Sequence, residues 1–171
     1  MSIPVLYTIT FILFIMHELE EIIFFNQWFN KNDKHLKERY PRLGRKMIRR
    51  FKDLSTKGFA LIAFEETIIL SILLLYAFEK MHPQIGLAVI LMLSIHWLLT
   101  IIQSVFIQRI IPGTYTSFAG TCFGICTFIT FANEYSASDY LKWGLLLFIF
   151  AMINLWGMHL LVTYYRKSKI K

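Results

Sequence analysis

The chain has 171 residues, of which 56% are hydrophobic and 16% aromatic, and its formal net charge is +7. This composition is too apolar for an ordinary water-soluble domain and favours a membrane protein. Eleven of the 18 Lys and Arg residues lie in residues 26–57 and four more in residues 166–171. Basic residues confined to two segments are typical of membrane topology, so we expect no nucleic-acid partner.

Five apolar segments each approach the roughly 20 residues that cross a bilayer as a helix. We therefore predict an all-α, polytopic transmembrane bundle that forms a single membrane domain over residues 1–171, with spans at about 5–28, 58–78, 85–108, 115–133 and 141–165. The last three connections are short and contain Pro, Gly or Ser, as turns do. Short connections make consecutive helices antiparallel neighbours.

The first segment carries His17, Glu18, Glu20 and Glu21 in the middle of an apolar run. Ionisable groups inside a membrane helix are costly, so they indicate a functional site. At about 100° per residue, His17, Glu20 and Glu21 share one face, whereas Glu18 points about a quarter turn away. We expect one of Glu20 and Glu21 to point into a site and Glu18 to face a neighbouring helix or a water path.

A basic loop over residues 29–57 follows, and it predicts the orientation of the chain. With this loop in the cytoplasm, 16 basic residues lie on that side and only Lys80 and Lys142 outside. We predict a multi-pass protein of the inner membrane with its N-terminus outside and its C-terminus in the cytoplasm. Within the loop, apolar residues at helical spacing predict an interfacial helix that contacts anionic lipids through segment 31–57, either as a topology anchor or in a lipid-binding role: Leu43, Met47, Ile48, Phe51 and Leu54.

The fourth segment contains Gly120-x-x-x-Gly124, a small-residue pattern typical of close helix packing in membranes. Cys122 and Cys126 lie in the same segment, and we expect them to pack there as small residues. A metal-binding or redox role of this pair is the alternative. Two cysteines four residues apart cannot supply a disulfide framework.

The predicted spans contain ionisable residues of only two kinds: Glu18, Glu20, Glu21, Glu65, Glu66, His17, His96 and His159. Carboxylates in hydrocarbon must be protonated, paired with a charged histidine or bound to a metal. Counted at about 1.5 Å per residue from the cytoplasmic ends, these side chains lie on four helices roughly 9–20 Å deep. Acids and histidines at a common depth in a bundle are typical of carboxylate–histidine metal sites.

We predict a divalent metal held by His17, Glu21, Glu66, His96 and His159, with Glu20 and Glu65 as catalytic groups. Nitrogen and oxygen ligands favour Zn, Fe or Mn. The spacing alone does not choose between the members of each glutamate pair. For His159 taken alone, a hydrogen bond between helices is the alternative. Thr100 and Gln103 lie on the face of His96 and can support it, whereas His35 and His82 are expected to be solvated loop residues.

The motif His17-x-x-Glu20-Glu21 resembles the signature of the HXXEE family, small bacterial integral membrane proteins of unknown function. Phe64-Glu65-Glu66, His96 and Pro112-Gly113 fit the same resemblance, which covers essentially the whole chain. The resemblance implies a membrane protein, and its motif an enzyme, but no particular reaction. Intramembrane proteases with a Glu-Glu-x-x-x-Arg motif differ, because Leu70 stands where the arginine is needed.

Three functions fit these residues. The first is a metal-dependent enzyme that acts on a lipid or other apolar substrate in the cytoplasmic half of the bundle. The second is a proton- or cation-coupled transporter, although the spans lack the repeats and broken helices typical of such folds. The third is an accessory subunit whose polar residues join helices. The bilayer is the expected partner in each case, and a homo-oligomer is compatible with all three.

Overall fold

The computed structural model describes residues 2–41, 56–131, 134 and 136–168. Within these ranges the chain forms helices and no strand: α1 (Ile3–Arg39), α3 (Thr56–Glu79), α4 (Pro83–Ile107), α5 (Thr114–Phe131) and α6 (Ala137–Ser168). The prediction of an all-α helical bundle is confirmed, with one helix at each predicted span. The interfacial helix predicted from Leu43 to Leu54 lies outside the described residues.

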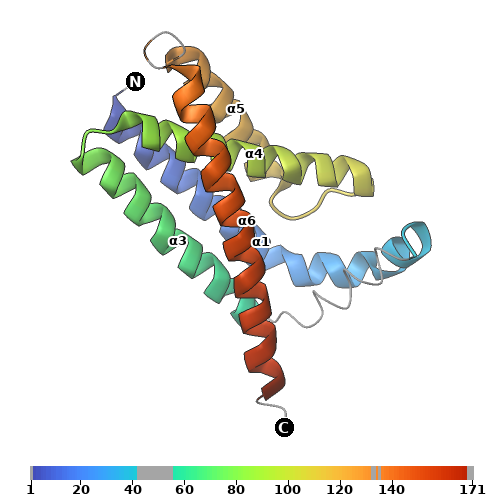
Figure 1. Ribbon diagram of the computed structural model, residues 1–171. Coiled ribbons are helices and arrows are strands. Elements are labelled where there is room, and N and C mark those ends of the chain that lie inside the picture. Colours follow the sequence, from blue (N-terminus) through green and yellow to red (C-terminus); the bar gives the residue numbers. More distant parts are fainter. Residues whose placement is uncertain (1, 42–55, 132–133, 135, 169–171) are drawn as a thin grey trace.

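Helix α4 is the centre of the bundle (Figure 1), since it contacts α1, α3, α5 and α6. Its N-terminal half is almost continuously apolar, and Leu87, Val89 and Ile90 are fully buried. Trp97, farther along the same helix, is also fully buried. A helix that is apolar on all sides is typical of a bundle core or of a membrane span. Consecutive helices run in alternating directions around α4, as the short connections predict.

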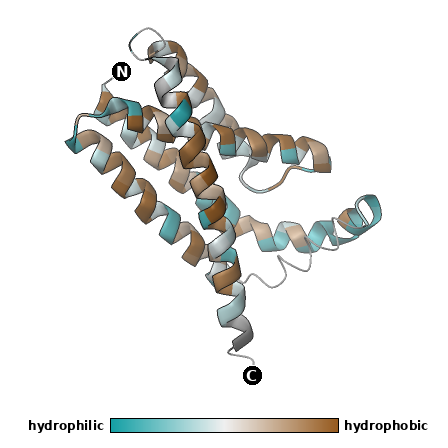
Figure 2. Cartoon of the chain, viewed as in Figure 1, coloured by the Kyte–Doolittle hydropathy of each residue, from teal (hydrophilic) through white to brown (hydrophobic). Residues whose placement is uncertain are grey.

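Helix α1 extends eleven residues beyond the predicted end at Trp28 and finishes at Arg39. Phe29 and Leu36 of this extension are buried against Ile107, the last residue of α4, and against Ile111 of the connection that follows. The predicted loop therefore begins later than expected. The hydropathy of the sequence marks where the apolar run ends, whereas the helix continues as an amphipathic one (Figure 2).

The extension of α1 also binds α4 through two hydrogen bonds. His35 Nε2 donates to the carbonyl oxygen of Ile107 at 3.1 Å, and the Tyr40 hydroxyl donates to that of Phe106 at 2.5 Å. These carbonyls belong to the last turn of α4, where no further helical N–H is available. The expectation that His35 is an ordinary solvated residue was wrong, because it caps the end of another helix.

The connection between α4 and α5 is held by its own hydrogen bonds. The Ser104 hydroxyl donates to the carbonyl oxygen of Arg109 at 2.8 Å and accepts from the N–H of Ile111 at 3.3 Å. Thr114 then donates its hydroxyl to the Ile111 carbonyl oxygen at 2.7 Å. Pro112 and Gly113, between these contacts, are buried. The connection therefore has a defined shape and can position residues of α5 against α1.

The Gly120-x-x-x-Gly124 pattern packs α5 onto α4, as predicted. A Cβ atom at Gly120 would overlap the indole ring of Trp97, and one at Gly124 would overlap the side chain of Ser94. The expected packing of Cys122 and Cys126 in this interface was wrong, because both are exposed. Each follows a glycine by two residues, about 200° around the helix, so it lies on the opposite face.

Gly120→Ala is expected to lower the free energy of unfolding by about 1–3 kcal/mol, because the added methyl group overpacks against the buried indole. Gly157→Ala is the matched control, since a Cβ atom at this position of α6 would have no other atom within 4 Å. Alanine there should leave stability unchanged or raise it by up to about 1 kcal/mol. Thermal unfolding in detergent checks this. Equal destabilisation by both changes would contradict the close approach of α5 to α4.

Among the described residues, three helical segments are long and apolar enough to cross a membrane: Thr56–Glu79, Pro83–Ile107 and Leu141–Tyr165. Figure 2 shows hydrophobic residues along most of α3, α4 and α6 and hydrophilic ones toward the C-terminal end of α1. In α1, Glu18, Glu20 and Glu21 interrupt the apolar run. The length and composition of these helices associate the chain with a membrane.

Candidate functional site

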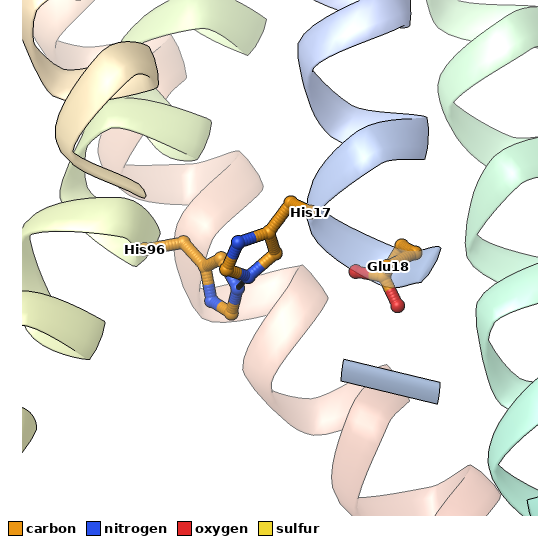
Figure 3. A group of neighbouring side chains, drawn as sticks. All are labelled: His17, Glu18 and His96. Atoms are coloured by element: carbon orange, nitrogen blue, oxygen red, sulfur yellow. Dashed lines mark hydrogen bonds between the residues drawn. The ribbon is translucent and has the colours of Figure 1, made fainter. Parts of the chain in front are cut away.

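Two histidines from different helices meet at the centre of the bundle. His17 of α1 is fully buried, and its Nε2 atom lies 3.2 Å from Nε2 of His96 of α4. The ring centroids are 5.1 Å apart and the rings are nearly perpendicular, at 87°. Figure 3 shows the two rings pointing toward one another. The helices thus bring together two histidines that are 79 residues apart in the sequence.

The other ring nitrogen of His17 is held by α5. His17 Nδ1 lies 3.1 Å from the Thr116 hydroxyl oxygen, which donates to Glu20 Oε2 at 2.8 Å or to the Gly113 carbonyl oxygen at 3.0 Å. A carbonyl oxygen and an ionised carboxylate both only accept, so with Glu20 ionised the Thr116 hydroxyl gives its proton to one of them. Its lone pair then accepts from His17 Nδ1–H. In the neutral ring this leaves the Nε2 lone pair of His17 directed at the site.

The two motif glutamates have different partners. Glu20 accepts a second hydrogen bond, from the backbone N–H of Thr116 at 3.2 Å. Glu21 instead lies beside the imidazole, with Oε1 3.5 Å from His17 Nε2. Glu21 therefore belongs with His17 and His96 to a central cluster. Glu20 lies on the Nδ1 side of the His17 ring, against Thr116. This division follows from the rotation of α1 relative to α5.

Gly113 closes the cluster from the connection before α5. Its φ of +87° lies in the region that favours glycine. A Cβ atom at this position would lie 2.7 Å from His17 Cε1 and 3.0 Å from Glu21 Oε1. Both features require glycine, because a side chain would be strained and would displace the cluster.

Two further carboxylates lie on the other side of the histidines. Glu18 is only 7% exposed, and its carboxylate and the two histidine nitrogens lie within 4.8 Å of one another, close enough to hold a metal ion. Figure 3 shows Glu18 on the side of α1 nearer α3. Glu66 of α3 is close enough to interact electrostatically with both Glu18 and Glu21. Glu18 was not among the ligands predicted from the sequence, and the structure places it in the cluster.

These hydrogen-bond and ion-pair distances also match the separation of neighbouring ligands on one ion. Two ligand atoms that each lie about 2.0–2.2 Å from a divalent metal are roughly 3–3.5 Å apart. The distances from His17 Nε2 to His96 Nε2 (3.2 Å) and to Glu21 Oε1 (3.5 Å) fall at this separation. The geometry and chemistry of the donor set therefore fit a divalent cation.

A cavity of about 80 Å³ adjoins the cluster and is bounded by α1, α3, α4 and α6. Glu18, Glu66 and His96 line it, together with Asn154 of α6. The remaining lining residues are apolar. An apolar cavity with a few convergent polar groups is the usual form of a small-molecule site.

Glu65 and Asn154 form a polar contact between α3 and α6. The Asn154 amide lies 3.2 Å from Glu65 Oε1 and 2.9 Å from Oε2, so it donates to the carboxylate. Glu65 and Glu66 thus take separate roles, since Glu66 lines the cavity and Glu65 binds Asn154. Asn154 was missed in the sequence. One asparagine in an apolar segment is a signal of a buried polar contact, although it does not identify the partner.

The other predicted residues lie outside this cluster. His159 is half-buried on α6, and it is neither a lining residue of the cavity nor part of the group with His17 and His96. Its role as a ligand stays a prediction. Thr100 donates its hydroxyl to the backbone carbonyl of His96 at 3.3 Å rather than to the ring, and Gln103 is exposed.

A family model described as a protein of unknown function with an HXXEE motif matches residues 8–127. The matched segment is 120 of the 171 residues and includes every cluster residue on α1, α3, α4 and α5. The chain belongs to the HXXEE family. Comparison of this HXXEE protein with curated proteins and with solved structures gave no match. Asn154 and His159 of α6 lie beyond the matched residues.

The structure gives the HXXEE motif a physical meaning. In this chain the histidine and the last glutamate, His17 and Glu21, meet at the centre, and Glu20 is tied through Thr116 to the back of the His17 ring. Thr116 and Ser117 were not identified as site residues from the sequence, and their hydroxyl oxygens lie 3.1 and 3.4 Å from His17 Nδ1. The nearby Pro112-Gly113 pair was the available signal, since such a turn brings the start of α5 to the end of α4.

Proposed function

We propose that this HXXEE protein is a divalent-metal-dependent membrane enzyme that acts on a lipid or another apolar substrate. The observation that carries the proposal is the buried approach of His17 Nε2 to both His96 Nε2 and Glu21 Oε1, at 3.2 and 3.5 Å, beside an apolar cavity. Buried histidines and carboxylates that converge from several helices are the usual ligands of metal centres in bundles.

The proposed ligands are His17, His96 and Glu18, whose donor atoms all lie within 4.8 Å of one another, with Glu21 as a fourth. Nitrogen and oxygen donors without thiolate suit Zn, Fe or Mn. Such an ion supplies Lewis acidity to the reaction. The Glu20–Thr116 pair orients the His17 ring, as outer partners of ligating histidines do.

Glu66 is the residue to which we assign the general-base role, because it lines the cavity next to the proposed ligands. Glu20 and Glu65, the catalytic groups predicted from the sequence, are each engaged by a donor, Thr116 and Asn154. We therefore assign them positioning roles, Glu20 toward His17 and Glu65 toward Asn154. His159 of α6 stays in the proposal as a fifth ligand.

The membrane arrangement is part of the same proposal. We infer five spans, with the N-terminus outside and the C-terminus and basic loop in the cytoplasm. The asymmetry of Lys and Arg supports this orientation in an inner membrane. The basic loop then lies on the anionic leaflet, to which its charge attracts it. The site would be in the cytoplasmic half of the bilayer, within reach of lipids of that leaflet.

Elemental analysis of the full chain, purified in mild detergent without chelator, tests the proposal. We expect about one Zn, Fe or Mn per chain, removal by a chelator, and recovery when the same metal is returned. Rebinding should also raise the unfolding temperature in proportion to the logarithm of the free metal concentration. Metal below roughly 0.2 per chain that cannot be increased by adding these ions would contradict the proposal.

Thr116→Val is expected to weaken metal binding about 10–100-fold, because it removes the acceptor that holds His17 Nδ1–H. Valine has nearly the shape of threonine, so packing is largely retained. Thr116→Ser keeps the hydroxyl and is expected to restore affinity close to that of the unmodified chain. Competition with a chelator of known affinity measures the difference. Equal affinities of the Val and Ser variants would show that the hydroxyl does not position His17.

A further inference from the structure

The cavity beside the cluster is small and mostly apolar. Its volume is about 80 Å³. At about 10–15 Å³ for each water-sized group, it has room for roughly six such groups. Its walls are formed by apolar side chains from four helices: Phe14, Ile69, Leu70, Met92, Leu93, Leu147, Phe148, Phe150, Ala151, Met152 and Leu155. Such walls gain free energy from contact with methylene groups.

Two of the four polar residues that line the cavity, Glu18 and His96, are also proposed metal ligands. Glu18, Glu66 and His96 lie on three different helices, and Asn154 completes the set from α6. The amide plane of Asn154 is fixed, because its nitrogen donates to Glu65. A ligand with an aliphatic chain against the apolar walls and a polar group at its end would place that polar group next to fixed polar side chains. The ligand that fits is an amphiphile.

One wall of the cavity is also the outer surface of the bundle. Phe150 and Met152 line the cavity and yet are 53% and 47% exposed on α6. Ala151 lies between them and also lines the cavity, where its small side chain leaves space. The segment Leu141–Tyr165 of α6 is apolar and not buried inside the bundle, so it would contact acyl chains of the bilayer. A route from the bilayer to Glu66 and His96 therefore leads past this part of α6.

We propose that the cavity between α1, α3, α4 and α6 binds one aliphatic chain of an amphiphile, which arrives from the bilayer past Ala151 and places its polar end at Glu66 and His96. This inference rests on the proposed function, because it makes that polar end the group on which the metal site acts. A chain of more than about six methylene-sized groups would extend from the cavity into the bilayer. The substrate class is then a single-chain lipid or one chain of a larger lipid.

Photolabelling of the full chain in phospholipid vesicles tests the inference. The probes are a long-chain fatty acid and a long-chain alcohol, each with a diazirine on its chain. We expect at least one probe to label peptides of the cavity walls, 69–70 or 147–155, and excess unlabelled compound to suppress this labelling. Ala151→Trp fills the cavity and should lower the labelling at least about fivefold, since overpacked sites exclude ligands.

Ala119→Trp is the matched control, because Ala119 is exposed on α5, a helix that contributes no lining residue to the cavity. It should leave labelling unchanged. Labelling that is not suppressed by excess compound, or is equal in Ala151→Trp and Ala119→Trp, would overturn the inference, because it would be ordinary contact with the bilayer. Metal content of the same samples separates the two proposals. If the protein retains metal but shows no specific labelling, the proposed lipid-binding cavity is rejected and the metal site is not. If it shows specific labelling but contains no metal, the proposed metal-dependent enzyme is rejected.

Discussion

His17→Ala is expected to abolish metal binding, lowering the content from about one ion per chain to less than roughly 0.2. His17 Nε2 is the atom that both His96 and Glu21 approach, at 3.2 and 3.5 Å. Its loss removes one ligand and also the ring that Thr116 and Glu20 orient. The remaining carboxylates would be left in an apolar setting without the ion that compensates their charge. Elemental analysis of the purified variant measures the effect.

His82→Ala is the matched control for this change, because His82 is exposed before α4 and outside the cluster. It should retain the full metal content. The accessory-subunit alternative predicts a different pattern, in which His17→Ala lowers the unfolding temperature while neither protein contains metal. The transporter alternative predicts ion flux in vesicles that requires Glu21 and Glu66. Retention of bound metal by His17→Ala would contradict the assignment of His17 as a ligand.

Gly113→Ala is expected to have the second largest effect, because it acts on the backbone and the site together. A Cβ atom would lie 2.7 Å from His17 Cε1 and 3.0 Å from Glu21 Oε1, so one of these groups must move. The φ of +87° adds strain of about 1–2 kcal/mol for a residue with a side chain. We expect both a lower unfolding temperature and at least a tenfold weaker affinity for metal, measured by chelator competition.

Gly113→Asn separates the two causes. Asparagine tolerates positive φ better than alanine, but it carries the same Cβ atom. If crowding of His17 and Glu21 is decisive, the Asn variant should lose metal affinity as much as the Ala variant while losing less stability. Full metal affinity in both variants would show that the connection before α5 does not set the geometry of the cluster.

Most of the fold was predictable because the apolar segments are long and are separated by Pro, Gly and Ser. The same rule failed in α1, where an amphipathic continuation to Arg39 buries Phe29 and Leu36 against α4. Hydropathy indicates which part of a segment is apolar, but it does not indicate the residue at which the hydrogen-bonded helix ends. The glycines of α5 were recognised as a packing surface. The exposure of the cysteines follows from their position two residues after each glycine, about 200° around the helix, which the prediction did not take into account.

The site was predictable in part. Counting depth along antiparallel helices was enough to place His17 and His96 at one level, and the structure brings their rings together. The choice within each glutamate pair depends on how α1 and α3 are rotated in the bundle. This rotation is set by packing around α4 and is not encoded in spacing along one helix. For the same reason, Glu18 was expected to point away from His17, and the partners Thr116 and Asn154 were not foreseen.

X-ray absorption spectroscopy of the metal-loaded chain tests the central claim most directly. We expect a shell of nitrogen and oxygen ligands at about 2.0–2.2 Å, with the multiple-scattering signature of two imidazole rings, from His17 and His96. His96→Ala should reduce this signature to one ring. A spectrum without imidazole, or with sulfur ligands at about 2.3 Å, would contradict the account, because the ion would then lie elsewhere in the chain.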